Sequence, residues 1–467
     1  MKPASAPASD PRVTPASPEI PFVVSWKERI CYGLSDTASN LIFQTIGVYM
    51  LYFYTDVFGL SAAAAGTMFL ITRLIDAPST FAMGILIDKT HTRWGQCRPY
   101  FLFLAAPFAV FAVLTFYVPS LGAAGKLIYA YITYNLVTLL FTAINLPISA
   151  MLPSMTNNPQ ERVEVSSTRM FLAFVGYTSV LYGTMPLVRY FGQGNEAKGF
   201  LHTLVLFAGL TFVFFLISFA NTRERFTPAK DSEPTLSAAF RSVLGNFPWL
   251  LMLLMNVVLW IGIAMRNQTI VYYLRYVVHR ADIIPSVMLT NLTALLGIVL
   301  APLLTRRIGK RNTTIFGTAV LTMGMGLIYT AGTSTIWLIV VGSAVANLGK
   351  GFFVGVGLAM MADTVDYGEW KTGVRAAGFL FGASTVGMKL GLGFGGAISA
   401  WVLSAGGYMP NAEQTVTALT AIRINFLLIP TVCAVLQILI LLCYRLDAQL
   451  PQVLRELRLR KESSPRA

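Results

Sequence analysis

The sequence predicts an all-α polytopic membrane protein with twelve transmembrane helices in two six-helix bundles. Its 467 residues are 55% apolar and only 12% charged, whereas about 25% of residues in soluble domains are charged. Twelve spans of about 20 apolar residues need roughly 240 such residues, and 55% of 467 is about 257. A long polar gap, from about 221 to 244, divides the apolar segments six and six.

The elements follow one another almost without pause. Residues 1–24 are rich in Pro, Ala and Ser and lack the apolar core of a signal peptide, so we expect a disordered tail there. The charged cluster Lys27, Glu28 and Arg29 opens the first apolar segment. The predicted spans are 32–57, 62–87, 99–119, 124–152, 164–190, 199–220, 246–276, 284–304, 312–331, 335–361, 375–404 and 417–444.

Basic residues set the expected orientation, because Lys and Arg are retained on the cytoplasmic side of a membrane. The net charge of +14 therefore indicates topology rather than a nucleic-acid partner, and both termini are expected in the cytoplasm. The loops on that side contain Lys89, Arg93, Arg98, Arg162, Arg223, Arg225, Lys230, Arg306, Arg307, Lys310 and Arg311. The predicted regions are a cytoplasmic tail (1–24), an N-terminal bundle (25–220), a cytoplasmic linker (221–245), a C-terminal bundle (246–445) and a cytoplasmic tail (446–467).

A weak internal repeat supports duplicated halves. Residues 92–98 after the second span and 305–311 after the eighth both place basic residues around a glycine. Many transporters consist of such halves, with the substrate site at the midplane between them. Basic composition is common to all cytoplasmic loops, however, and explains the likeness equally well.

Ionisable side chains inside apolar spans cost about 2.5–3.5 kcal/mol on insertion scales, so each marks a candidate functional site. In the second span, Asp76, Ser79 and Thr80 are spaced i, i+3, i+4 and face one direction. One carboxylate with two hydroxyls can bind sodium, with Asp76 as the charged ligand, or Asp76 can bind a proton. The structural alternative is an ion pair between Asp76 and Arg73 that only ties helices together.

Other buried polar groups suit a sugar. Asp36 and Asn40 share a face of the first span at i, i+4, and Arg169 and Lys389 are cations in the fifth and eleventh spans. Facing a common cavity, these cations would donate hydrogen bonds to sugar hydroxyls or a carboxylate. The alternative for each cation is a side chain that extends toward the membrane interface.

Charged residues at the end of the tenth span predict structural or gating contacts rather than chemistry. The candidates are Asp363, Asp366, Glu369 and Arg375, together with Arg73 and Arg98. Four glycines in the eleventh span, Gly391, Gly393, Gly395 and Gly396, allow close helix approach. The chain contains no phosphate-binding loop, metal-ligand spacing or nucleophile motif, so neither an enzyme nor a cofactor is predicted.

Motifs spread over both halves resemble a known family. They are Tyr32-Gly-Leu-Ser-Asp36, the segment 53–61, Thr92-Arg-Trp-Gly95 with Arg98-Pro-Tyr, Asn145-Leu-Pro147 and the segment 362–370. From Trp26 to about residue 445 the chain resembles the glycoside–pentoside–hexuronide:cation symporters of the major facilitator superfamily. It is more similar to the glucuronide carrier and the xyloside or pentoside transporters than to melibiose permease.

The resemblance implies a bacterial inner-membrane protein with the major facilitator fold, acting as a monomer by alternating access. It would import a glycoside, such as a hexuronide, a pentoside or a related acidic sugar, with a proton or sodium ion. The implied cation site is Asp76, Ser79, Thr80 and Thr142. The implied sugar site is Asp36, Asn145, Ser149, Arg169 and Lys389, beside Asn40.

Two departures from the family pattern refine these expectations. Thr80 stands where the family usually has a second carboxylate, which favours a proton over sodium. Asn145 and Ser149 stand where melibiose permease has an aspartate and a tryptophan, and losing the aspartate favours an acidic sugar beside Arg169 and Lys389. An uncoupled facilitator or an exporter is the nearest alternative function, and a non-transporting sugar sensor is a more distant one.

Overall fold

The computed structural model describes residues 23–226, 243, 245–333 and 335–463. Their regular secondary structure is helical, apart from one isolated β-bridge between Thr92 and Gly95. The predicted N-terminal tail lies almost wholly outside these residues, as does most of the predicted linker at 221–245.

The first half of the chain forms six long helices, the first extended by a π-helical turn. Side-chain oxygens of Ser25, Ser61, Asn158 and Asn195 accept backbone N–H groups at helix N-termini, which fixes where four of these helices begin. The elements are α1 (Trp26–Tyr52), η1 (Phe53–Val57), α2 (Ala62–Lys89), α3 (Arg98–Thr115), α4 (Ala123–Met155), α5 (Pro159–Gly192) and α6 (Glu196–Asn221).

The second half repeats this plan with more interruptions. Asn246 caps its first helix and also donates to the backbone oxygen of Thr364 at 2.7 Å. The elements are α8 (Phe247–Tyr272), η2 (Tyr273–Val277), η3 (Ala281–Ile283), α9 (Ile284–Leu289), η4 (Thr290–Leu292), α10 (Thr293–Ile308), α11 (Lys310–Ala331), α12 (Ile336–Thr372), α13 (Ala377–Ala405), α14 (Val416–Arg423), η5 (Ile424–Leu428), α15 (Ile429–Cys443) and α16 (Leu446–Ser463).

The predicted all-α membrane architecture is confirmed. Within the described residues, eleven helical segments are long and apolar enough to cross a membrane, and they coincide with the second to twelfth predicted spans. The first predicted span is α1, which packs against α5 and α6 inside the bundle. It is not among the eleven, and its apolar stretch is interrupted by Asp36, Asn40 and Gln44.

Two segments differ from the sequence-based expectation. Helix α12 continues to Thr372, eleven residues past the predicted end of the tenth span, so Asp363, Asp366 and Glu369 lie on a helix. The stretch from residue 446, predicted as a tail, forms α16. The indole Nε1 of Trp370 on α12 donates to Glu456 on α16 at 2.6 Å, which ties the two helices together.

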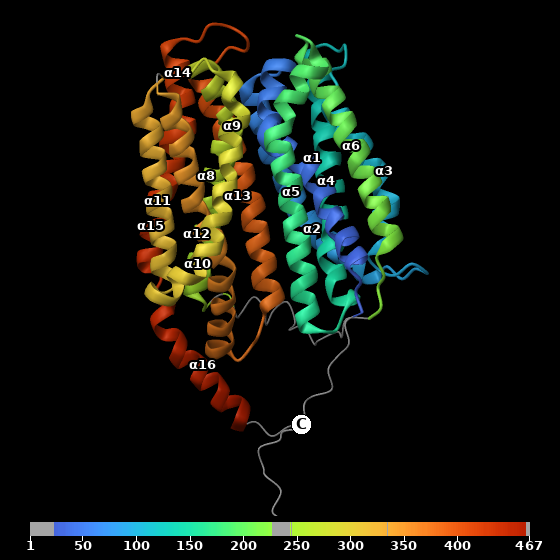
Figure 1. Ribbon diagram of the computed structural model, residues 1–467, viewed down its shortest axis with the longest axis vertical. Coiled ribbons are helices and arrows are strands. Elements are labelled where there is room, and N and C mark those ends of the chain that lie inside the picture. Colours follow the sequence, from blue (N-terminus) through green and yellow to red (C-terminus); the bar gives the residue numbers. More distant parts are fainter. Residues whose placement is uncertain (1–22, 227–242, 244, 334, 464–467) are drawn as a thin grey trace, which may run out of the picture.

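The helices form two groups side by side, with α1–α6 in one and α8–α15 in the other (Figure 1). Helix α2 packs on α13, α1 on α8, and α5 on α9 across the boundary. Helix α16 extends from one end of the molecule, which we call the α16 end, and the opposite end is the far end (Figure 1).

Glycines let α13 pack on both halves at once. A Cβ atom at Gly393 would lie 2.7 Å from Cβ of Arg73 on α2, and one at Gly395 would lie 2.7 Å from Cβ of Ala264 on α8. Contacts that short are not tolerated, so small residues are needed at these positions for close helix approach. Helix α13 is therefore the element through which the second half reaches α2.

We expect Gly395→Ala to lower the thermal stability of the detergent-solubilised protein. The added methyl group overpacks the α8–α13 contact, which costs about 1–3 kcal/mol. Gly382→Ala on the same helix is the matched control, because a Cβ there meets nothing within 4 Å. Equal melting temperatures for the two variants would contradict this account of the packing.

Candidate functional site

A buried carboxylate, Asp76, lies at the boundary between the two halves. Its side chain is 1% exposed and accepts a hydrogen bond from Thr142 of α4 at 2.6 Å and one from Ser79 at 3.2 Å. Lys389 of α13 lies 3.0 Å from its other oxygen, and Arg73 lies 3.4 Å from that same oxygen. With Thr80, these residues form what we call the Asp76 cluster.

The Lys389 ammonium connects the halves through this cluster. It donates to Thr80 at 2.7 Å and to Thr142 at 3.0 Å, in addition to its ion pair with Asp76. All three donors of the ammonium are therefore used. Gly393 follows Lys389 by one helical turn and packs against Arg73, which brings α13 close enough for these bonds.

The structure thus brings together the four residues predicted as a cation site, namely Asp76, Ser79, Thr80 and Thr142. Lys389, predicted with the sugar residues, lies in this cluster instead. The ion pair of Arg73 with Asp76, considered from their i, i+3 spacing, is present, but Lys389 is the nearer cation.

A second polar cluster lies within the first half, around Asp36. Arg169 of α5 forms an ion pair with the Asp36 carboxylate and donates to Ser149 of α4 at 3.1 Å. The guanidinium also lies 3.4 Å from the hydroxyl of Tyr32, which itself donates to the backbone oxygen of Ile148 at 2.5 Å. We call these residues the Asp36 cluster.

Polar side chains follow one stripe of α1 from this cluster toward a central cavity. Asn40 donates to the backbone oxygen of Asp36 at 2.9 Å and accepts from Gln44 at 3.1 Å. Gln44 lines a cavity of about 400 Å³ between the halves. Asn145, also predicted for the sugar, is half-buried on α4, one turn before Ser149.

The central cavity is lined by both halves. From the first half come Gln44, Arg73 and Tyr177, and from the second Trp260 and Lys350. Its volume suits a mono- or disaccharide, since ligand pockets measure about 300–1,000 Å³. Arg73 belongs to both the cavity and the Asp76 cluster, so a molecule bound in the cavity could contact a partner of the buried carboxylate.

At the far end, hydrogen bonds join the halves into a closed seal. The carboxylate of Asp56 on η1 accepts from Tyr276 of η2 and from Tyr408, which lies 2.7 Å away, and Asn411 donates to its backbone oxygen at 2.7 Å. Thr55 bonds to Tyr272 at 2.7 Å. We call this group the Asp56 latch.

An outer layer of contacts surrounds the latch. Glu196 accepts from Tyr52 at 2.6 Å and pairs with Arg275 of η2 at 2.9 Å. Arg189 donates to the backbone oxygen of Ala281 at 2.8 Å. The far end of the central cavity is therefore closed by several polar contacts between the halves.

At the α16 end, the described ion pairs tie each half to itself. In the first half Glu28 pairs with Arg225 at 2.7 Å, and the hydrogen bonds to Glu28 raise the pKa of Arg225. Arg98 donates to the backbone oxygen of Phe219 at 2.7 Å. These contacts hold the connecting segments against the first half.

The predicted gating residues of the second half pair locally. Asp363 accepts from Lys310 of α11, with its Oδ1 2.7 Å away, and Arg375 pairs with Asp366 at 3.0 Å and with Glu369 at 2.5 Å. The hydrogen bond to Glu369 raises the pKa of Arg375. These bonds stiffen the extension of α12.

Sequence reasoning missed two groups of residues. The Asp56 latch lies in the segment 53–61, which entered the sequence analysis only through its resemblance to a family. Arg266 of α8 and Lys350 of α12 were also overlooked, although both are ionisable residues in apolar spans and the rule that singled out Asp76 applies to them.

The sequence matches the protein family described as MFS/sugar transport protein over residues 31–448. It is 42% identical over 455 residues to the isoprimeverose transporter of Lactiplantibacillus pentosus, covering 96% of this chain and 95% of that protein. It is 34% identical over 425 residues to the inner membrane symporter YicJ of Escherichia coli strain K12, covering 90% and 91%.

The fold also matches solved structures. A bacterial homologue of the human lysosomal transporter Spinster, in an inward-facing and unoccupied conformation, superposes with a TM-score of 0.69. The match covers 91% of this chain and 99% of that one at 14% sequence identity. At that identity the likeness concerns the fold alone.

We expect Asp56→Asn to open the far end of the cavity. Hydrogen bonds to a charged group contribute about 1.5–3 kcal/mol each, so weakening one raises the open population roughly tenfold or more. The measurement is the rate at which an impermeant maleimide, added on the far side, labels Gln44→Cys in a background without the native cysteines. Tyr329→Phe, at a side chain 75% exposed, is the control, and unchanged labelling in Asp56→Asn would refute the latch.

Proposed function

The chain belongs to the glycoside–pentoside–hexuronide:cation symporter family of MFS/sugar transport proteins, and we propose that it carries a glycoside across the membrane with a cation bound at the Asp76 cluster. The observation that carries this proposal is the Lys389 ammonium of the second half, bonded to Asp76, Thr80 and Thr142 of the first. Alternating access then moves the two halves about the central cavity.

The charge on Asp76 controls this contact between the halves. While Asp76 is ionised, its carboxylate compensates Lys389 and the contact is stable. When a cation binds the carboxylate, Lys389 loses that compensation in a site of low dielectric. Binding of the cation is thereby linked to release of α13 from α2 and α4.

We propose that the coupling ion is a proton. Sodium requires several oxygen ligands, and the oxygens of Thr80, Thr142 and Asp76 already receive the three donors of Lys389. A proton needs only one carboxylate oxygen and leaves the two hydroxyls in place. The single carboxylate of this cluster supports the same choice.

The Asp36 cluster is the proposed binding surface for sugar hydroxyls. Arg169 and Asp36 neutralise each other, and Ser149 and Asn40 offer donors and acceptors beside them. Such groups can donate hydrogen bonds to vicinal sugar hydroxyls and accept hydrogen bonds from them. The argument for an acidic sugar from Arg169 and Lys389 is weakened, because both cations already pair with carboxylates.

The proposed location is a bacterial inner membrane, with the α16 end and both termini in the cytoplasm. The support is the basic character of the loops at that end and the similarity to YicJ, an inner membrane symporter. The closed Asp56 latch would then face outward. Both polar clusters are complete within one chain, so we propose that a monomer is functional.

We expect Asp76→Asn to abolish accumulation of sugar against a gradient while preserving exchange of labelled for unlabelled sugar. An amide cannot take up a proton, so binding of the ion no longer controls Lys389. The measurement is uptake of labelled isoprimeverose, and of xylosides and glucosides, into proteoliposomes. Asp282→Asn is the matched control, because this carboxylate on η3 is exposed and pairs with the neighbouring Arg280.

Normal accumulation by Asp76→Asn would exclude the coupling role. The unmodified protein would instead be an uncoupled facilitator if the sugar concentration inside the vesicles never exceeded the concentration outside under any imposed ion gradient. Accumulation of sugar that occurs only when the ion gradient points in the opposite direction to sugar movement would identify an exporter.

We expect an inward proton gradient to drive accumulation equally well in sodium and in choline buffers. The reason is that Lys389 already occupies the oxygen ligands that sodium would need. Initial rates of sugar uptake are measured once under a pH gradient alone and once under a sodium gradient alone, and the two rates are compared. Accumulation that requires sodium and ignores the pH gradient would show that sodium displaces Lys389.

A further inference from the structure

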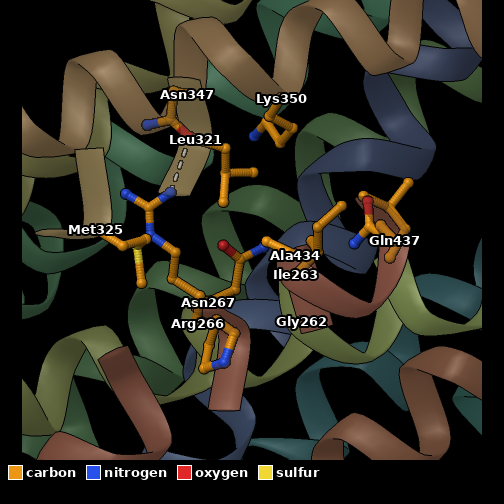
Figure 2. Close-up of a pocket in the computed structure, with 12 residues that line it drawn as sticks. Gly262, Ile263, Arg266, Asn267, Leu321, Met325, Asn347, Lys350, Ala434 and Gln437 are labelled. Carbon is orange, nitrogen blue, oxygen red and sulfur yellow. Dashed lines mark hydrogen bonds between the residues drawn. The ribbon is translucent and has the colours of Figure 1, made fainter. Parts of the chain in front are cut away.

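Two cations lie within the membrane-spanning part of the second half. Arg266 is on α8 and Lys350 on α12, and both line a small pocket together with Asn347, Asn267 and Gln437 (Figure 2). The head groups of Arg266, Asn347 and Lys350 point into the same part of this pocket (Figure 2). Lys350 and Asn267 also line the central cavity, so the small pocket adjoins it.

The described bonds of these cations are made to amides. Arg266 donates to Asn347 at 3.4 Å, and Lys350 donates to Asn291 of η4 at 2.8 Å. The ion pairs found among the described residues include neither cation, whereas Arg73, Arg169 and Lys389 each pair with a carboxylate. A guanidinium has five N–H donors and an ammonium three, so most of their capacity is unused by the described partners.

Cations inside a membrane-spanning bundle are costly without a counter-charge. The desolvation penalty for an unpaired ion in a protein interior is several kcal/mol, and amide oxygens offset only part of it. A negatively charged ligand would offset more of it than an amide does. The three amide side chains around the pocket also supply N–H donors, which suit an anion as further partners.

The size of the pocket indicates which part of a ligand enters it. Its volume of about 30 Å³ holds about two water-sized groups. That is room for the two oxygens of a carboxylate but not for a sugar ring. The ring itself fits the adjoining cavity of about 400 Å³, where Trp260 offers an aromatic face and Tyr177 a hydroxyl.

We propose that Arg266 and Lys350 form an oxyanion subsite, which binds the carboxylate of an acidic glycoside while its ring lies in the central cavity. The inference rests on the proposed sugar transport and assigns recognition of the carboxylate to Arg266 and Lys350, outside the Asp36 and Asp76 clusters. Asn291 extends the subsite to the first half, because its Oδ1 accepts from both Lys350 and Tyr177 of α5, at 2.8 and 3.1 Å. A carboxylate that draws Lys350 away from Asn291 therefore acts directly on a contact between the halves.

The test compares two ligands that differ at one carbon, p-nitrophenyl β-D-glucuronide and p-nitrophenyl β-D-glucoside. Their affinities for the purified protein are measured by calorimetry, without any ion gradient. We expect the glucuronide to bind about tenfold to a hundredfold more tightly, because a charged hydrogen-bonded contact contributes at that scale. Arg266→Gln is expected to remove this preference while leaving the affinity for the glucoside nearly unchanged, because Arg266 lines the small pocket and not the central cavity. Lys350→Gln is expected to remove the preference as well.

Arg423→Gln on α14 is the matched control, because this exposed arginine lines neither the small pocket nor the central cavity and its loss should leave the preference intact. Retained glucoside binding shows that the variants are folded. An unmodified protein that binds the glucoside as tightly as the glucuronide, or that binds neither, overturns the subsite. Proton-driven uptake of glycosides without any such preference would overturn the subsite alone and leave the proposed transport in place.

Discussion

The structure depends on one constraint, which is that a charge inside the membrane needs a counter-charge within reach. Asp76 and Lys389 satisfy this constraint for each other across the boundary between the halves. Because the two residues come from different halves, relative movement of the halves separates the charges. The cost of separating them in low dielectric is what allows a small ion to control a large movement.

The three mid-membrane clusters differ in how completely carboxylates balance their positive charges. Around Asp36, one carboxylate meets one guanidinium; around Asp76, one carboxylate meets two cations; around Lys350, the described partners of two cations are amides. Positive charge in excess of carboxylate therefore increases from the first half, through the boundary, to the second half. A protonated Asp76 would increase the excess at the boundary, and an anionic ligand would reduce it in the second half.

Local patterns in the sequence were enough to predict the spans and to group residues that share one helix. They were not enough to predict which residues on different helices contact each other. The i, i+3, i+4 spacing correctly grouped Asp76, Ser79 and Thr80 because they share α2. No spacing rule relates Lys389 to Asp76, since their contact depends on how α13 packs, which in turn depends on Gly393 and Gly395. The helical extension of α12 could have been found, because Asp363, Asp366 and Glu369 recur every three residues.

The Asp56 latch differs in burial and in the type of hydrogen-bond partner from the Arg275–Glu196 pair outside it. Asp56 is 8% exposed and is held by tyrosine hydroxyls, whereas the side chains of Arg275 and Glu196 are 29% and 39% exposed. Dissolved salt screens exposed charges but has little effect on buried ones. Added salt would thus weaken the outer pair more than the inner seal, so the latch is the part of this closure that is less sensitive to ionic strength.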